Sequence, residues 1–353
     1  MKKTIIAAAL VTALTLTASA QKRFGVTVFS ADFMRLQPDY ESALENQVLM
    51  GTPVEILDSQ GYWLKIRTPE PYTAWATDMG IVQMDSLQLA DYIAAPKYIC
   101  TATWAEVFNS PEKGAARISD LVAGDLLLTR YGDNGKPLKS NGFLGVTLPS
   151  GKKGYVYSFN VSGFSSWASS RKATPDNVVR TALKFLGTPY MWGGTSSKGV
   201  DCSGLTRSAY FMNGVLLHRN ASQQIREGNE VDISGLKKRI AAVARNVADG
   251  GMDSIGSFGD LKKGDLLFFG RIADDGTEKI THVGMYIEDG RFIHSSHVVR
   301  INSLDASLPD YYLGSTRLLR ARRIVDEEGV PYTSGLISDS PYYFPQASGN
   351  DKK

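Results

Sequence analysis

The sequence contains few cysteines and few histidines. Two cysteines, Cys100 and Cys202, and four histidines occur in 353 residues. Two cysteines cannot form the disulfide framework of a small secreted domain, and a bridge between them would consume a thiol with the features of a nucleophile, so we expect both to stay free. Neither C-x-x-C nor H-E-x-x-H occurs. A zinc site built from one cysteine and two histidines is therefore the weaker interpretation, and we expect no metal and no cofactor.

The sequence also lacks a strong excess of either charge. Lys and Arg total 39 and Asp and Glu total 36, which gives a net charge of +3. Lys2 and Lys3 lie in the first twenty residues, which contain no acid, so the remaining chain carries +1 (3 minus 2). A nearly neutral chain gives no reason to expect nucleic acid or an anionic membrane as a partner. We expect a monomer.

Apolar runs long enough to cross a membrane are missing. The run from Ile5 to Leu16 is too short, and it lies between two lysines and the small residues Ala18-Ser19-Ala20. This order is typical of a secretory signal peptide. We expect residues 1–20 to be a signal peptide and the remainder to be exported, to the periplasm or outside the cell, without a membrane anchor.

Two successive segments, residues 21–90 and 91–165, show the pattern of short β-strands. In the first, Val54–Leu57, Trp63–Arg67 and Tyr72–Trp75 alternate polar and apolar residues, and turns are predicted between them over residues 58–61 and 68–71. Short strands at this spacing indicate a small β-barrel or sandwich. The first segment resembles bacterial SH3-like domains, and the second resembles a diverged copy with longer loops.

Residues 172–325 change to helices followed by strands. A helix is predicted over 177–187 and a second from Cys202, and the predicted strands lie at 264–270, 281–287 and 291–296. Helices first and antiparallel strands after predict an α+β domain. Residues 227–258 follow no pattern that we recognise. The tail over 326–353 is expected to be irregular, to lie along the surface and to fray at its end.

Cys202 stands where a glycine-rich loop meets the start of a helix. Leu205 and Ala209 follow at helical spacing, and Asp201 is suited to cap the first turn. Free backbone N–H groups and the positive end of the helix dipole favour a thiolate there, so we expect a nucleophile with a lowered pKa. Burial as a packing residue is the alternative for a lone cysteine, and it is what we expect for Cys100.

A nucleophilic cysteine needs a base, and the base needs a group that orients it. His282 and His294 belong to two strands that meet at Glu288–Gly290. A two-residue turn would place the histidines on opposite faces of the hairpin. A three-residue turn with a left-handed glycine would pair Gly284 with His294 and place both on one face. A site made of Cys202 and both histidines therefore predicts the three-residue turn.

Five short motifs follow one another through this segment: Tyr190-Met-Trp-Gly-Gly, Asp201-Cys-Ser-Gly, Gly264-Asp-Leu-Leu-Phe-Phe, His282-Val-Gly-Met-Tyr and Phe292-Ile-His294. In this order they resemble the NlpC/P60 family of cell-wall cysteine peptidases. The resemblance implies a papain-like catalytic domain in which Cys202 is the nucleophile, His282 the general base and His294 the residue that orients it. It also implies that Tyr190 helps to hold the oxyanion.

The order of the segments further resembles the γ-D-glutamyl-L-diamino acid endopeptidases, which cut muropeptides with a free N-terminal L-alanine. In that subgroup the first SH3-like domain closes one end of the cleft. The resemblance implies an L-Ala-γ-D-Glu-diamino acid substrate, an amine held by Glu45, Tyr72 and Asp201, and a pocket lined by Ser203 and Ser222. An ammonium group taken from water needs carboxylate partners, which agrees with this assignment.

Other interpretations stay open at this point. The chain could cut intact peptidoglycan stems, transfer acyl groups, or bind the wall without catalysis. Glu45 could be a solvated surface charge, Tyr72 a packing residue of the barrel, and Asp201 no more than a helix cap.

Overall fold

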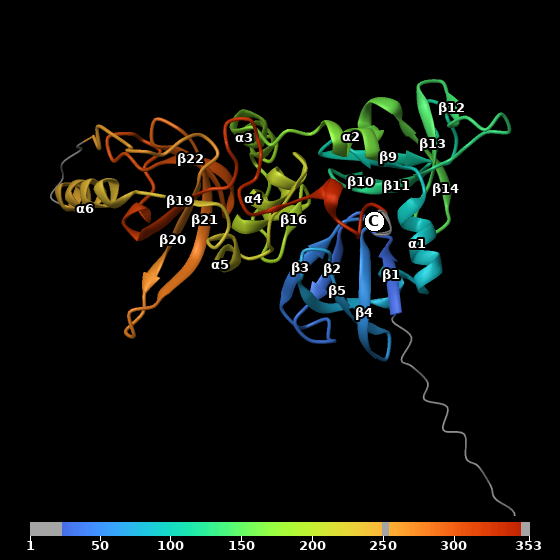
Figure 1. The fold of residues 1–353 in the computed structure, drawn as a ribbon, viewed down its shortest axis with the longest axis horizontal. Coiled ribbons are helices and arrows are strands. Elements are labelled where there is room, and N and C mark those ends of the chain that lie inside the picture. Colours follow the sequence, from blue (N-terminus) through green and yellow to red (C-terminus); the bar gives the residue numbers. More distant parts are fainter. Residues whose placement is uncertain (1–22, 249–253, 347–353) are drawn as a thin grey trace, which may run out of the picture.

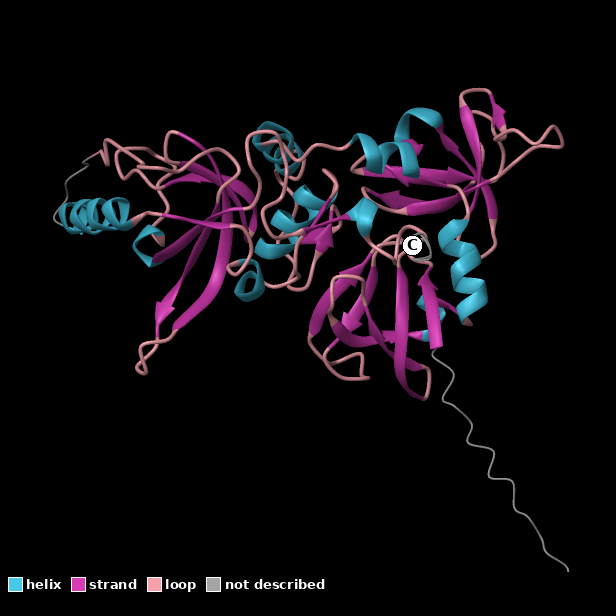
Figure 2. Ribbon diagram, in the orientation of Figure 1, coloured by secondary structure: helices cyan, strands magenta, loops and turns pink. Residues whose placement is uncertain are grey.

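The computed structural model describes residues 23–248 and 254–346, so the predicted signal peptide lies outside the described residues. Two sheets of short strands precede a part in which helices pack against a third sheet (Figures 1 and 2). None of the helices in the described ranges has the length and apolar character needed to cross a membrane.

The first sheet contains seven antiparallel strands in the order β3-β2-β6-β5-β4-β1-β7. Alternate side chains of these strands, including Val54, Leu64 and Ile66, fill its core. The strand that begins at Pro53 continues to Gln60, further than predicted, and the chain turns at residues 61–62. The bounds are β1 Arg23–Thr27, β2 Asp32–Arg35, β3 Leu44–Val48, β4 Pro53–Gln60, β5 Trp63–Arg67, β6 Thr73–Thr77 and β7 Ile81–Met84, and the helix α1 Ser86–Ala94 follows.

The second sheet has the order β10-β9-β14-β13-β11-β8-β15, with β12 paired to β13. Cys100 is fully buried in its core and is a free thiol, as is Cys202, so the two cysteines form no bridge. The bounds are β8 Lys97–Cys100, β9 Trp104–Phe108, β10 Arg117–Val122, β11 Leu126–Thr129, β12 Lys139–Ser140, β13 Phe143–Thr147, β14 Lys153–Tyr157 and β15 Val161–Gly163, and the helix α2 Phe164–Ser170 follows.

The third sheet runs in the order β19-β24-β20-β21-β22-β23 and is covered on both faces. Leu266 and Phe268 of β20 pack with α3 and α4 on one face, and Leu267 and Phe269 pack with α6 on the other. This explains the unbroken apolar run of β20, because every residue of a strand covered on both faces is buried. The bounds are α3 Pro175–Leu183, α4 Cys202–Phe211, α5 Ala221–Gln224, β19 Asn229–Val231, α6 Ser234–Ala248, β20 Leu266–Ile272, β21 Glu278–Glu288, β22 Arg291–Ser296, β23 Val298–Ser303 and β24 Leu318–Arg323.

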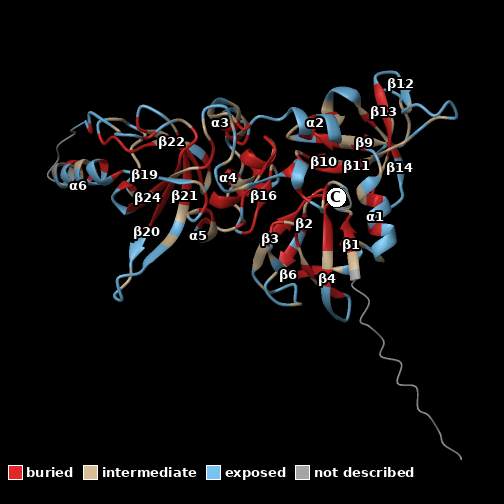
Figure 3. Cartoon of the chain, viewed as in Figure 1, coloured by how far each residue is buried: buried red, intermediate tan, exposed pale blue. Residues whose placement is uncertain are grey.

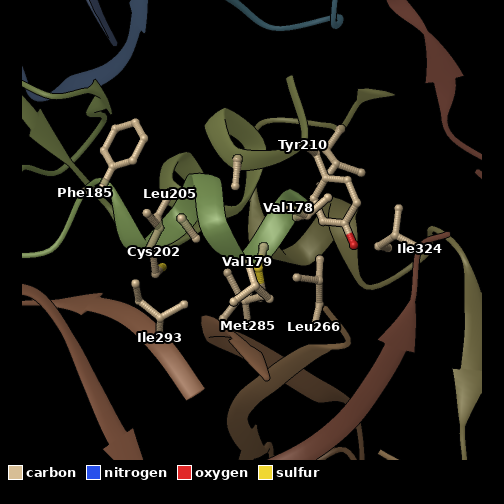
Figure 4. Packing of buried hydrophobic residues seen from close by; sticks show 14 of the residues in the cluster. Val178, Val179, Phe185, Cys202, Leu205, Tyr210, Leu266, Met285, Ile293 and Ile324 are labelled. Atoms are coloured by element: carbon tan, nitrogen blue, oxygen red, sulfur yellow. The ribbon is translucent and has the colours of Figure 1, made fainter. Parts of the chain in front are cut away.

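Two parts of this sheet differ from a compact layer. The ends of β20 and β21 that meet in a hairpin project from the molecule and are exposed (Figure 3). Residues 227–258, where no sequence pattern was recognised, contain β19 and α6, and residues 249–253 among them lie outside the described residues. On the face covered by α3 and α4, Figure 4 shows Val179 of α3 close to Met285 and Leu266 of the strands, and Leu205 of α4 beside Cys202.

The C-terminal tail lies along the surface only over residues 326–336, and residues 337–343 enter the interior. Its predicted frayed end, residues 347–353, lies outside the described residues. Ile337 is fully buried and Tyr343 is 4% exposed, in a cluster shared with Phe164 and Phe211. β25 (Gly335–Leu336) pairs with β18 (Val215–Leu216), and the hydroxyl of Tyr342 donates to a carboxylate of the first sheet. The tail thus passes between the two N-terminal β-sheets (Figure 1). Burial of its large aromatic side chains stabilises this position.

Candidate active site

A cavity of about 460 Å³ lies between the first sheet and the start of α4. Glu45 of β3 and Tyr72, which precedes β6, line one side, and Cys202 lies at the other. Every predicted site residue except the two histidines takes part in this lining. The complete set is Glu45, Tyr72, Tyr190, Trp192, Asp201, Cys202, Ser203, Arg219, Asn220, Ala221, Ser222, Ile280 and Thr281.

The loop before Cys202 is shaped by hydrogen bonds to Asp201. Its carboxylate accepts from the backbone N–H of Gly204 at 2.7 Å, which caps α4, and from that of Gly193 at 2.9 Å. Gly204 has to be glycine, because a Cβ there would lie 2.0 Å from the carbonyl oxygen of Gly194. The Asp-Cys-Ser-Gly motif therefore folds one tight junction, with Cys202 as the first helical residue.

The environment of Cys202 does not lower the pKa of its thiol, so that prediction is wrong. Burial, and next the negative charge of Asp201, raise the pKa of the thiol to about 11. Hydrogen bonds from the backbone N–H groups of Val283 and Ser203, and the charge of Arg219, act in the opposite direction without offsetting them. The helix dipole is opposed by the carboxylate that caps the same helix.

His282 and His294 form a hydrogen-bonded pair beside this junction. His282 Nε2 lies 2.7 Å from His294 Nδ1, and His294 Nε2 lies 2.8 Å from Asn302 Oδ1. His294 is fully buried. Burial, with the other histidine and Arg317 as smaller causes, lowers the pKa of His282 to about 3, and burial lowers that of His294 to about 4. Both rings are neutral at neutral pH.

In the hairpin that carries the histidines, the predicted register is confirmed and the predicted turn length is wrong. Met285 pairs with Ile293, so Gly284 faces His294 as predicted, and both histidines share a face. The turn has two residues, Asp289 and Gly290, both with positive φ, and not three. A β-bulge between Tyr286 and Glu288 supplies the missing residue and restores the register.

The predicted amine-binding residues are joined in the structure by Arg219, which binds one of them, Asp201. The hydroxyl of Tyr72 donates to Glu45, and burial together with this carboxylate raises the pKa of Tyr72 to about 12. Arg219 is 3% exposed and binds both carboxylate oxygens of Asp201. It also donates to Ser203 Oγ at 3.0 Å. The charge of Asp201 is therefore already paired, while Glu45 has no cationic partner among the described residues.

Contacts hold the first sheet, which carries Glu45, against residues 172–325. Two residues further along β3, the side chain of Gln47 accepts from the backbone N–H of Thr195 at 2.9 Å and from Ser196 Oγ at 3.0 Å. A buried ion pair joins Glu70 to Arg207 of α4. Glu45 lies at a β-bulge opposite Met34 and Arg35, two residues before Gln47, and lines the cavity.

Two residues of the site were not found by reading the sequence. Arg219 stands three residues before Ser222, and a buried Asp201 requires a cation, but nothing in the sequence shows which one. Asn302 reads as an ordinary polar strand residue. The other two histidines lie apart from this pair: His218 contacts Glu227 at 3.0 Å, and His297 is exposed.

Two parts of the chain match known protein families, and curated proteins resemble most of its length. Residues 187–317 match the NlpC/P60 family and residues 30–79 the bacterial SH3 domain. A Lysinibacillus sphaericus protein named dipeptidyl-peptidase 6 is 29% identical over 78% of this chain and 89% of its own length. A Bacillus cereus protein named gamma-D-glutamyl-L-lysine dipeptidyl-peptidase is 28% identical over 78% of this chain and 75% of its own.

One solved structure covers nearly the whole described fold. The crystal structure of an NlpC/P60 family protein from Bacillus cereus ATCC 10987 matches 85% of this chain and 99% of its own, with a TM-score of 0.65 and 23% identity. At that identity the match establishes the fold.

Proposed function

Starting from a chain that carries an NlpC/P60 domain behind a bacterial SH3 domain, we propose that it is a cysteine peptidase of cell-wall peptides. It hydrolyses the bond between the γ-carboxyl of D-glutamate and an L-diamino acid, in peptides with a free N-terminal L-alanine. One observation carries the proposal: Glu45 and Tyr72, from the first sheet, line the same cavity as Cys202. The names of the curated relatives give independent support.

In the proposed reaction the Cys202 thiol attacks the γ-carbonyl carbon and His282 takes the proton. Because thiol and imidazole are both neutral beforehand, the proton moves as the sulfur–carbon bond forms. The backbone N–H at the start of α4 and the hydroxyl of Tyr190 stabilise the oxyanion. His282 then gives the proton to the leaving amine, the carbon–nitrogen bond breaks, and water releases the acyl group from sulfur.

The amine of the substrate is held by Glu45 and Tyr72 in this proposal. Glu45 is the cavity carboxylate without a cationic partner among the described residues, so it is free to pair with an ammonium group. Asp201 contributes less directly, because Arg219 already binds it. Ser203 and Ser222 also line the cavity, and in this proposal they contact the D-glutamate residue of the substrate.

The test is mass spectrometry of the products from L-Ala-γ-D-Glu-diaminopimelate and from its N-acetylated form, with wild type and Cys202→Ala. Release of L-Ala-γ-D-Glu from the free peptide alone, and none with the variant, supports the proposal. Equal cleavage of both forms would leave the peptidase but remove the amine-binding role, and would favour action on intact stems. No cleavage of either would favour a wall-binding protein.

We also propose that the chain works as an exported monomer. The first twenty residues support export, and the mass of the mature protein, expected to begin at Gln21, tests it. Light scattering of the purified mature chain tests the monomer.

A further inference from the structure

Behind the histidine pair lies a chain of hydrogen bonds that ends on the protein backbone. From His282 it runs through His294 to Asn302, and Asn302 Nδ2 donates to the backbone carbonyl oxygen of Asp310 at 2.7 Å. His294 is fully buried and Asn302 is half-buried. The rings of Phe292 and Tyr312 lie 4.9 and 5.1 Å from the ring of His294, so the pair sits in aromatic surroundings.

The donor and the acceptor of each hydrogen bond in this series follow from its last acceptor, the backbone carbonyl oxygen of Asp310. A backbone carbonyl oxygen only accepts hydrogen bonds, so the amide nitrogen of Asn302 has to face Asp310. The reversed amide would bring two acceptor oxygens to 2.7 Å. Oδ1 of Asn302 therefore faces His294, and His294 Nε2 has to carry a hydrogen.

A neutral imidazole has one protonated nitrogen, which leaves Nδ1 of His294 as an acceptor. At 2.7 Å from it, Nε2 of His282 has to be the donor. The remaining nitrogen of His282, Nδ1, then carries no hydrogen and is able to accept a proton. Burial keeps both rings neutral, as described above.

We propose that Asn302 is a positioning residue that fixes one tautomer on both histidines, so that His282 offers an unprotonated Nδ1 to the Cys202 thiol. Asn302 touches neither the thiol nor the cavity; it acts through His294. The inference deepens the proposed function, since it concerns the base that activates Cys202, and it rests on that function only for its kinetic consequence.

The tautomers are measured without substrate. Selective ¹⁵N-histidine labelling of the full chain gives four imidazoles, and His218→Gln and His297→Gln assign the two rings that lie outside the pair. In the wild type we expect His282 and His294 to show protonated Nε2 and unprotonated Nδ1. A protonated Nδ1 on His282 in the wild type would overturn the proposal.

Three variants separate tautomer control from support of the fold. Asn302→Leu leaves Nε2–H of His294 buried without an acceptor, so we expect that ring to move its proton to Nδ1, and His282 to become protonated on Nδ1 in place of Nε2. Asn302→Asp keeps an acceptor for His294, so Nε2 of that ring should stay protonated, while the lost donor to the carbonyl oxygen of Asp310 should lower stability. Arg291→Gln is the matched control: it releases Asp310 Oδ2, bound at 3.2 Å, from the same loop without touching a histidine.

For cleavage of L-Ala-γ-D-Glu-diaminopimelate, Asn302→Leu should lower kcat by about 10- to 100-fold with KM little changed, the scale on which outer hydrogen-bond partners of functional histidines act. Asn302→Asp should lose less kcat than Asn302→Leu, because His294 keeps its acceptor, and Arg291→Gln should behave as wild type. A fall in kcat with unchanged tautomers in Asn302→Leu, or equal losses in all three variants, would show a structural role instead. If the peptide is not cut at all, the proposed function fails, and the spectra still decide the tautomer.

Discussion

Replacing Glu45 by glutamine tests the amine-binding end of the cavity. The change removes the negative charge and keeps the size of the side chain and an oxygen for the hydroxyl of Tyr72, which donates to Glu45. Arg219 already pairs with Asp201, so no second free carboxylate remains among the cavity residues to replace the lost charge. The substrate ammonium group would lose its charged partner and keep a neutral one.

A hydrogen bond to a charged group contributes about 1.5–3 kcal/mol. That range corresponds to a loss of about 10- to 150-fold in kcat/KM for the free-amine peptide, and since Glu45 is only half-buried, we expect the lower part of the range. The N-acetylated peptide carries no charge, so its cleavage should not fall. The preference for the free amine should therefore shrink by the same factor.

The assay is product release from both peptides at several concentrations, with Glu41→Gln as a matched control. Glu41 is exposed, lies four residues earlier and does not line the cavity. An equal loss on both peptides would mean that Glu45 supports the fold of the first sheet. An unchanged preference for the free amine would refute the assignment of Glu45.

Three further predictions concern ionisation and stability. Burial raises the pKa of the Cys202 thiol to about 11, so the rate at which iodoacetamide alkylates Cys202, followed by peptide mapping, should rise from pH 6 to pH 10 without a plateau. A rate that is already constant at pH 7 would show that Cys202 is a thiolate with a lowered pKa. The pKa of His282 is lowered from 6.5 to about 3, so the unfolded chain binds more protons between these values, and the free energy of unfolding should rise with pH from about 3 to 6.5; urea unfolding at pH 4.5 and 7 checks the sign, and His282→Asn should flatten the slope. Tyr343→Ala should cost about 3–5 kcal/mol in urea unfolding, whereas Tyr342→Phe, which removes one hydrogen bond to Glu55, should cost about 1 kcal/mol; similar small costs for both would mean that the tail contributes little to stability.

Local pattern was sufficient where a feature depends on neighbouring residues. The strand at Trp63–Arg67 has its predicted bounds, and Asp201 caps the helix that begins at Cys202, because alternation and capping act over a few residues. That His282 and His294 share one face of the hairpin was also predicted from the sequence. The length of the turn between them was predicted wrongly, because a bulge in a strand and an extra residue in the turn shift the register of the hairpin equally.

Long-range contacts decided the remainder. Three contacts join residues that are distant in sequence and whose types could pair with many others. They are the ion pair of Asp201 with Arg219, the burial of Tyr343 between the sheets and the hydrogen bond of Asn302 with His294. The pKa of Cys202 is the clearest case: the sequence shows the helix start, which favours a thiolate, but only the tertiary structure shows the burial that opposes it. Sequence alone indicated the residues that we propose to carry the chemistry, and packing determined their charge, because desolvation depends on everything that surrounds a group.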